Sequence, residues 1–163
     1  MIITLARECG CQGDLIGLEL AKMYQLPFYD RKKVSDLIRS KGTLDRFPDF
    51  YGENPVDTLS YSILLGRCGN YAYCDREDAL RIFLMGQVEQ RVETIAKKHG
   101  VSVRKAKETV KETDERRRAY HLRYTGQDWG YAGNYDLCLN VSRLGTQGVM
   151  EAIQTAVRTI TDH

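Results

Sequence analysis

The hydrophobic pattern of the chain alternates short apolar runs with longer amphipathic segments. Short runs rich in apolar residues predict strands at residues 2–5, 27–29, 62–65, 79–85 and 137–140. Helical spacing of apolar residues predicts one helix that starts near residue 15. It predicts further helices at 33–39, 87–99, 102 to about 118, and 149–160. Because strands that alternate with helices form parallel sheets, the pattern predicts a three-layer α/β domain.

A glycine-rich segment, Arg7–Gly13, separates the first predicted strand from the first predicted helix. Strand, glycine-rich turn and helix is the arrangement that directs backbone N–H groups and a helix N-terminus at a phosphate. A P-loop carries a lysine just before the helix, where Gly13 stands in this chain. From these residues alone, a phosphate-binding loop and an ordinary turn between strand and helix are both open.

Composition indicates one globular domain. The chain has 163 residues, of which 42% are hydrophobic and 28% are charged. It has no apolar run of membrane-spanning length and no recognisable signal peptide, so we expect no membrane partner. Five cysteines without a scaffold-like spacing indicate a reducing, cytoplasmic location. Cys9 and Cys11 have no second pair at zinc-site spacing, so we expect no metal site built by the chain.

Positive charge is concentrated in residues 97–118, which contain nine Lys/Arg and four Asp/Glu, a local charge of +5. Such a concentration favours an anionic partner. A solvated helix face with i,i+4 ion pairs explains the same residues equally well. No groove-reading motif accompanies the charge, so we do not expect nucleic acid to be the partner.

Several polar residues follow predicted strands and should therefore lie near each other. Ligands of parallel α/β sheets bind beyond the carboxyl ends of the strands. This rule brings together the 7–13 loop, Asp30, Arg67 and the turn after Asn140. The irregular stretch of residues 40–60, interrupted by glycines and prolines, is long for a loop and is typical of a functional segment.

Six segments occur in the order expected of the cytidylate-kinase-like family: RECGCQG, PFYD, LLGRCGNY, RIFLMGQVEQR, ETDERRRAYHLRYTGQDWG and YDLCLNVSRLG. The spacing from Asp114 to Arg117, Tyr120 and Thr125-Gly126 also resembles the family pattern. The chain is thus similar to the P-loop nucleoside-monophosphate kinases. The resemblance implies a parallel-sheet P-loop NTPase fold with a helical lid, in a single domain over residues 1–163. Within it, residues from about 30 to 62 would form a reduced acceptor-binding region and residues from about 101 to 130 the lid.

The resemblance also implies a set of site residues. The phosphate of a nucleotide would bind the loop formed by Arg7, Glu8, Cys9, Gly10, Cys11, Gln12, Gly13 and Asp14. The acceptor would bind Asp30, Arg31 and Arg67, and catalysis would use Arg67, Arg117 and Asp114. The segments Tyr135-Asp136 and Asn140–Gly145 would correspond to the last strand and the loop beside the donor base. Arginines suit these roles because guanidinium binds phosphate oxygens in pairs and keeps its charge.

The activity implied by the resemblance is ATP-dependent phosphoryl transfer to a nucleoside monophosphate, with CMP or dCMP as the expected acceptor and Mg²⁺ as the expected cofactor. Three departures favour an alternative, a catalytically degenerate nucleotide-binding protein of the same fold. Gln12 replaces a glycine of the family loop, Asp14 stands where a basic residue is frequent, and the acceptor-binding region at residues 40–61 is shorter than in the family. In addition, Cys68 takes the place of an aspartate of cytidylate kinase. No residue can be assigned as a magnesium ligand from the sequence, and the oligomeric state stays open.

Overall fold

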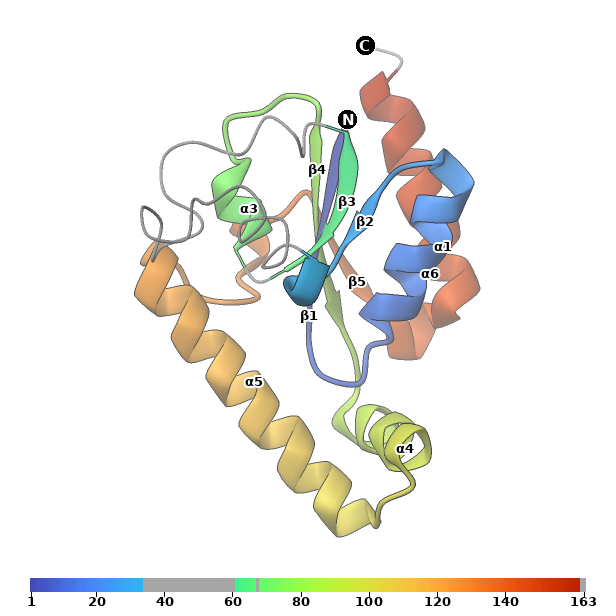
Figure 1. Cartoon of the computed structure of the whole chain (residues 1–163), viewed down its shortest axis with the longest axis vertical. Coiled ribbons are helices and arrows are strands. Elements are labelled where there is room, and N and C mark those ends of the chain that lie inside the picture. The colour runs from blue at the N-terminus through green and yellow to red at the C-terminus, as the bar shows by residue number, and fades with distance from the viewer. Residues whose placement is uncertain (34–60, 67, 162–163) are drawn as a thin grey trace.

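A five-stranded parallel sheet forms the centre of the molecule, in the strand order β2-β3-β1-β4-β5 (Figure 1). The computed structural model describes residues 1–33, 61–66 and 68–161. The strands are β1 (Ile2–Arg7), β2 (Phe28–Tyr29), β3 (Ser62–Leu65), β4 (Ala79–Met85) and β5 (Leu137–Asn140). All four pairings are parallel, so the carboxyl ends of the strands meet at one edge.

Helices cover both faces of the sheet and its carboxyl edge. They are α1 (Gly13–Tyr24), α3 (Gly69–Ala72), α4 (Val88–His99), α5 (Val103–Thr125) and α6 (Val141–Thr161), with a 3-10 turn at Ala132–Asn134. Helices α1 and α6 lie on one side of the sheet and α3 lies on the other (Figure 1). The three layers predicted from the alternation of strands and helices are confirmed.

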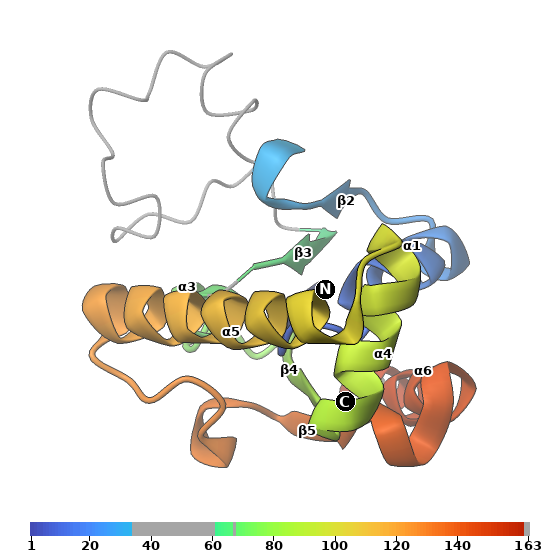
Figure 2. The same ribbon diagram turned by 90° about the horizontal axis from the view of Figure 1, so that it is seen from below.

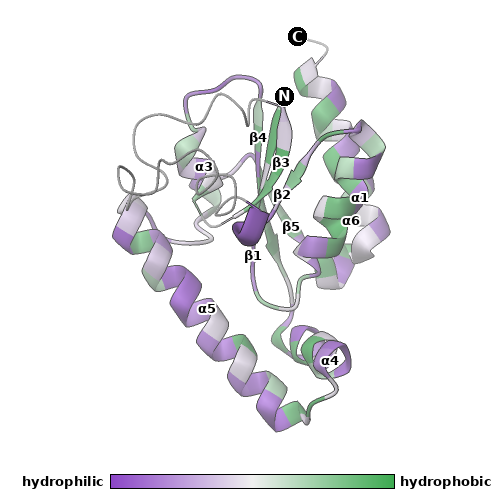
Figure 3. Cartoon of the chain, viewed as in Figure 1, coloured by the Kyte–Doolittle hydropathy of each residue, from purple (hydrophilic) through white to green (hydrophobic). Residues whose placement is uncertain are grey.

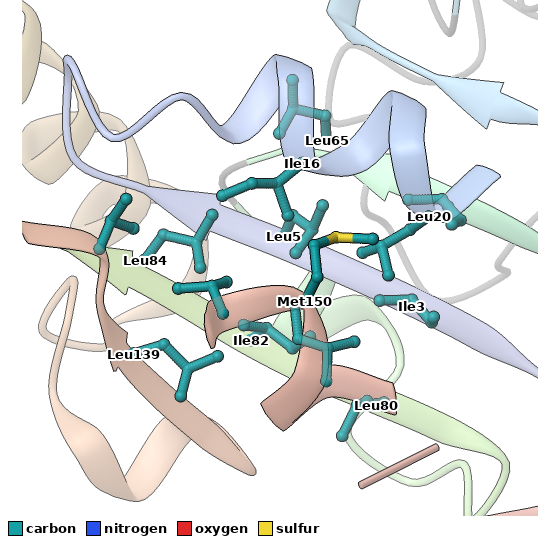
Figure 4. Packing of buried hydrophobic residues seen from close by; sticks show 14 of the residues in the cluster. Ile3, Leu5, Ile16, Leu20, Leu65, Leu80, Ile82, Leu84, Leu139 and Met150 are labelled. Atoms are coloured by element: carbon teal, nitrogen blue, oxygen red, sulfur yellow. The ribbon is translucent and has the colours of Figure 1, made fainter. Parts of the chain in front are cut away.

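The main hydrophobic core lies between the sheet and the pair α1 and α6. Strand side chains alternate between faces, so Ile3 and Leu5 of β1 point into this layer together with Ile82 and Leu84 of β4 (Figure 4). All four of these side chains are fully buried. A long apolar run such as that of β4 is what a strand covered on both faces requires.

Aromatic side chains close the opposite face. The ring of Phe83 on β4 lies 5.3 Å from that of Trp129 and 5.1 Å from that of Tyr135. Both partners belong to the segment that returns from α5 to β5. Offset and edge-to-face contacts at such distances stabilise aromatic clusters beyond simple burial. The return segment therefore fixes the C-terminal end of α5 to the sheet.

Helices α4 and α5 lie beyond the carboxyl edge, which α5 crosses (Figure 2). Ala106 and Val110 of α5 pack on Val92 and Ile95 of α4, while most of the α5 surface is hydrophilic (Figure 3). The Ser102 hydroxyl accepts a hydrogen bond from the Lys105 N–H and so caps the N-terminus of α5. In the described part of the chain, no helix has the length and apolarity needed to cross a bilayer.

The predicted elements agree with the structure in most places. The strands at 62–65, 79–85 and 137–140 have the predicted bounds. The sequence pattern missed α3, which has a single turn and no apolar period. It also placed the start of the last helix at residue 149, whereas α6 begins at Val141 and bends at Gly145, which has φ +66°. The predicted 33–39 helix and 40–60 loop lie outside the described residues, apart from helical residues 31–33.

We predict that Leu84→Ala lowers the free energy of unfolding by about 3 kcal/mol, because it removes buried methyl groups and leaves a cavity against α6. Chemical denaturation followed by circular dichroism measures this change. Leu144→Ala, at an exposed position on α6, is the matched control and should stay within about 0.5 kcal/mol of the parent chain. Equal losses in both variants would contradict the assigned core.

Candidate phosphate-binding site

The loop between β1 and α1 contains a tight turn that requires glycine. The Cys11 N–H donates to the Glu8 carbonyl at 3.3 Å, and Gly10, the third residue of this turn, has φ +88°. A positive φ at the third position is the geometry of a type II turn. A Cβ at Gly10 would also lie 2.5 Å from the Arg91 carbonyl oxygen. Both backbone conformation and close approach to α4 thus exclude a side chain here.

Glu8 anchors the loop to the end of β4. Its N–H donates to the Leu84 carbonyl at 2.9 Å, and its carboxylate accepts from the Gly86 N–H at 3.0 Å. The same carboxylate lies 3.4 Å from the guanidinium of Arg91 on α4. The family resemblance groups Glu8 with the phosphate-binding residues, and that role stays a prediction. The observed contacts of the Glu8 side chain are structural. It holds the loop in place against the neighbouring strand.

A buried ion pair joins the loop to α4 and α5. The Asp114 carboxylate accepts from the Cys9 N–H at 2.7 Å and from Arg91 Nη1 at 2.6 Å. Arg91 also donates to the Cys9 carbonyl at 3.2 Å and to the Gly86 carbonyl at 3.0 Å. Arg91 and Asp114 are only 7% and 9% exposed. Paired charges and hydrogen bonds of this kind are what makes buried charges tolerable.

The sequence analysis did not single out Arg91. It lies four residues before Ile95, on the apolar face of α4, and that placement is the signal that could have indicated it. A basic residue within a helical hydrophobic face usually has a buried partner. Asp114, expected to act in catalysis, has both carboxylate oxygens engaged with the loop and Arg91, so its catalytic role stays a prediction.

Two arginine side chains contact the loop. Arg117, one turn after Asp114 on α5, donates to the Arg7 carbonyl at 2.8 Å. The Arg7 side chain lies along the loop, because a Cβ at Gly13 would be only 2.9 Å from Arg7 Cγ. A larger residue at Gly13 would displace Arg7. The structure therefore brings Arg7, Gly13 and Arg117 together, and their roles at a phosphate stay predictions.

The end of the loop is occupied in part by a carboxylate. Gln12 has a left-handed backbone (φ 52°), and α1 begins directly after it. The Asp14 carboxylate pairs with Lys98 of α4 at 2.5 Å. Partial burial opposes its ionisation, but the hydrogen bond and charge of Lys98 and the N–H groups of Asp14 and Leu15 lower its pKa. Asp14 is thus a carboxylate at neutral pH, and it complements the helix dipole.

Three N–H groups of the loop have no partner within the part of the chain that the structure describes: those of Gly10, Gln12 and Gly13. Successive N–H groups around a turn with a positive φ form concave anion-binding sites. The loop consequently combines open donors with the Arg117 guanidinium on the Arg7 carbonyl and with the Arg7 side chain beside Gly13. This arrangement can bind a phosphate group.

The two loop cysteines are buried neutral thiols. Desolvation raises the pKa of Cys9 and raises that of Cys11 to about 12. A thiol at such a pKa is a poor metal ligand and a poor nucleophile, since both roles need the thiolate. Among the described residues, no group of three or more His, Cys, Asp or Glu side chains could hold a metal ion.

The expected acceptor residues are described only in part. The Asp30 carboxylate accepts from the Lys33 N–H at 2.9 Å, as a helix-capping residue does, and Arg31 is exposed. Arg67 lies outside the described residues, so its expected role in acceptor binding and catalysis stays a prediction. Asp136 pairs with Arg81 at 2.6 Å, at the amino ends of β5 and β4, away from the loop.

Comparison with known proteins identifies the family of the chain. The model of the cytidylate kinase-like family matches residues 2–61 and 53–143. The chain belongs to this family. The matched residues include the loop between β1 and α1 as well as α4 and α5, and they end in the first turn of α6.

Two curated relatives are named cytidylate kinase. The protein of Pyrococcus horikoshii is 31% identical over 78 residues, which is 48% of this chain and 41% of that protein. The protein of Thermococcus kodakarensis is 30% identical over 78 residues, which is 48% of this chain and 40% of that protein. The aligned part of the present chain thus spans less than half the length of either relative.

Solved structures share the fold. An uncharacterized protein from Eubacterium ventriosum superposes with a TM-score of 0.83 at 23% identity, covering 98% of both chains. Shikimate kinase from Bacteroides thetaiotaomicron gives a TM-score of 0.56 at 11% identity, covering 97% of this chain and 98% of its own. The architecture of this cytidylate kinase-like chain is therefore the α/β fold of P-loop kinases.

We predict that Asp114→Ala lowers the free energy of unfolding by about 3 kcal/mol, because it leaves the Arg91 guanidinium buried without its closest carboxylate. Urea denaturation measures the loss. Glu112→Ala, at an exposed position on the same helix, should change stability by less than about 0.5 kcal/mol. An Asp114→Ala chain as stable as the Glu112→Ala chain would refute the importance of this pair.

Proposed function

We propose that the protein is a cytoplasmic nucleoside-monophosphate kinase that transfers a phosphoryl group from ATP to CMP or dCMP. The observation that supports it most is the loop with three open N–H groups between Arg7 and Arg117. Membership of the cytidylate kinase-like family and the two relatives named cytidylate kinase support the same proposal. A base preference for cytosine rests on those names.

In the proposed reaction, residues 7–14 bind the phosphates of ATP. Phosphoryl transfer needs positioning and neutralisation of charge more than covalent chemistry by the protein. The Gly10, Gln12 and Gly13 N–H groups supply fixed donors, and Arg7 supplies the positive charge that a P-loop lysine gives elsewhere. A guanidinium suits this task because it stays charged and can bind two phosphate oxygens.

Residues from about 101 to 130 act as the lid of the proposed enzyme, with Arg117 as the residue that contacts the transferred phosphoryl group. Arg117 is one turn away from Asp114, whose contacts attach α5 to the loop. On the acceptor side we propose Asp30, Arg31 and Arg67, in a binding region from about 30 to 62. Arg67 is included because the Gly66-Arg67 motif resembles a motif of the family.

A magnesium ion would reach the site with the phosphates of ATP and would neutralise part of their charge. The carboxylates in and beside the loop are already engaged. Glu8 contacts Gly86 and Arg91, Asp114 contacts Cys9 and Arg91, and Asp14 pairs with Lys98. The described residues thus do not fit a Mg²⁺ site of their own. In this proposal the ion is held by the nucleotide.

One observation favours the second candidate, a nucleotide-binding protein without catalysis. The Asp14 carboxylate lies at the start of α1, where the N–H groups of Asp14 and Leu15 lower its pKa and where a phosphate would otherwise gain from the helix dipole. Release of ADP from ATP in the presence of CMP separates the two functions. Protection by an ATP analogue without ADP release would favour the binding protein.

We predict that Arg7→Ala loses the thermal protection that ATP gives the parent chain. A ligand that binds the native state raises the melting temperature because it adds to the free energy of unfolding. At saturating ligand, a tenfold loss of affinity removes about 1.4 kcal/mol of that added free energy. Differential scanning fluorimetry with ATP and each nucleoside monophosphate measures the effect. Arg104→Ala, an exposed position on α5, is the control and should keep full protection. Undiminished protection of Arg7→Ala would exclude Arg7 from the site.

We predict that Arg117→Ala lowers kcat at least about tenfold, with a smaller change in KM for ATP, because its guanidinium acts on charge that develops during transfer. A coupled assay of ADP release measures both constants. Arg116→Ala removes the exposed neighbouring charge and should keep the parent kcat. Equal constants for the two variants would contradict the assignment of Arg117.

A further inference from the structure

Arg91 contacts three parts of the molecule that meet at the loop between β1 and α1. Its guanidinium donates to Gly86 at the end of β4, to Cys9 in the loop and to Asp114 on α5. Neither the sequence motifs nor the proposed reaction gives it a role. Because it is buried and committed to these partners, it does not itself reach a nucleotide.

The hydrogen bond from Arg91 to the Cys9 carbonyl has a directional consequence. The Cys9 carbonyl and the Gly10 N–H belong to one planar trans peptide group, so they point in opposite directions. While Arg91 Nη1 binds this carbonyl at 3.2 Å, the Gly10 N–H points away from Arg91. That N–H is one of the three open donors of the loop.

The orientation of this peptide group is a choice between two turn types. In a type I turn the central peptide group is turned over, and the third residue has φ near −90°. The same Cys11-to-Glu8 hydrogen bond would persist, but the Gly10 N–H would face the opposite side. Glycine tolerates both conformations, so the residue type alone does not select one. The conformation of the turn must therefore be selected by contacts to the Cys9 carbonyl.

We infer that Arg91 is a positioning residue of the phosphate site. It holds the Cys9–Gly10 peptide group in the type II orientation and so directs the Gly10 N–H at the phosphate. Asp114 fixes Arg91 from the other side and binds the preceding N–H, that of Cys9. The inference rests on the proposed function, because it needs a phosphate bound at the loop.

Selective isotope labelling isolates this peptide group. In the whole sequence the dipeptide Cys-Gly occurs at Cys9-Gly10 and Cys68-Gly69. Full-length protein with ¹³C-carbonyl cysteine and ¹⁵N-glycine therefore gives two signals in a carbonyl-to-amide correlation spectrum. The Cys68→Ala variant removes the Gly69 signal and assigns both. The Gly69 signal then reports an intact α3, and the Gly10 signal reports the loop.

The experiment titrates the non-hydrolysable ATP analogue AMP-PNP, with Mg²⁺, into the parent chain, Arg91→Met and Arg91→Lys. We expect the Gly10 signal of the parent chain to shift on binding. In both variants it should start from a different position, with an affinity at least about tenfold lower, because a charged ligand loses an aligned donor. Arg91→Lys keeps the charge beside Asp114 but lacks the planar fork that reaches both carbonyls. It covers the case in which Arg91→Met fails to fold.

Arg81→Met is the matched control for a general loss of stability. It breaks another arginine–carboxylate pair, Arg81 with Asp136, at the opposite edge of the sheet. We expect a lower melting temperature with an unchanged Gly10 signal and an unchanged affinity for AMP-PNP. A loss of affinity in Arg81→Met equal to that in the Arg91 variants would overturn the inference.

The remaining outcomes are distinct. If the parent chain binds AMP-PNP and Arg91→Lys binds it equally tightly with the Gly10 signal in the parent position, the positioning role is wrong while the proposed function stands. If the parent chain gives neither a shift at Gly10 nor heat in calorimetry, the phosphate loop itself is refuted and the inference with it.

Discussion

The pairing of Arg91 with Asp114 is the constraint on which the rest of the site depends. Removing two charges from water costs several kcal/mol per ion, and their attraction offsets this only when the remaining donors and acceptors are also satisfied. Here the Cys9 peptide groups and the Gly86 carbonyl complete the set. The loop, α4 and α5 are therefore held in one arrangement by polar contacts, where the apolar stripe of α5 is thin.

These contacts hold the loop between β1 and α1 in its conformation, although the loop has no lysine. A P-loop lysine contributes charge from within the loop, and this chain instead has arginines that approach from β1 and α5. Carboxylates also approach, through Asp14 and Asp114, so the local charge balance is less positive than the sequence of residues 97–118 suggests. Most of the positive charge of α5 is on its solvent-facing side.

Much of the fold could be predicted from the sequence, because buried parallel strands have a strong apolar pattern. The runs at 62–65, 79–85 and 137–140 predict strands with the observed bounds, and the longest run, 79–85, forms a strand with a neighbour on each side. The start of α6 could not be predicted so well. Its first turn follows β5 directly, with the Asn140 side chain accepting from the Arg143 N–H, and its period is interrupted at Gly145.

The site could be predicted only as far as motifs reach. Glycine positions and the Asp114-to-Arg117 spacing identified the loop and the helix that crosses it. The partner of Asp114 could not be found in this way, because the pairing joins residues 23 positions apart on different helices. Hydrophobic periodicity treats Arg91 as an interruption, whereas a buried charge is informative only once its partners are known.

The single tryptophan of the chain lies where α5 returns to the sheet. The rings of Trp129 and Phe83 make a T-shaped contact, and the guanidinium of Arg118 on α5 lies 5.8 Å from the centre of the Trp129 ring. Indole emission depends on nearby charge and on exposure to water. The protein thus contains its own optical reporter of how α5 sits on the sheet, and movements of that helix can be followed without attaching a dye.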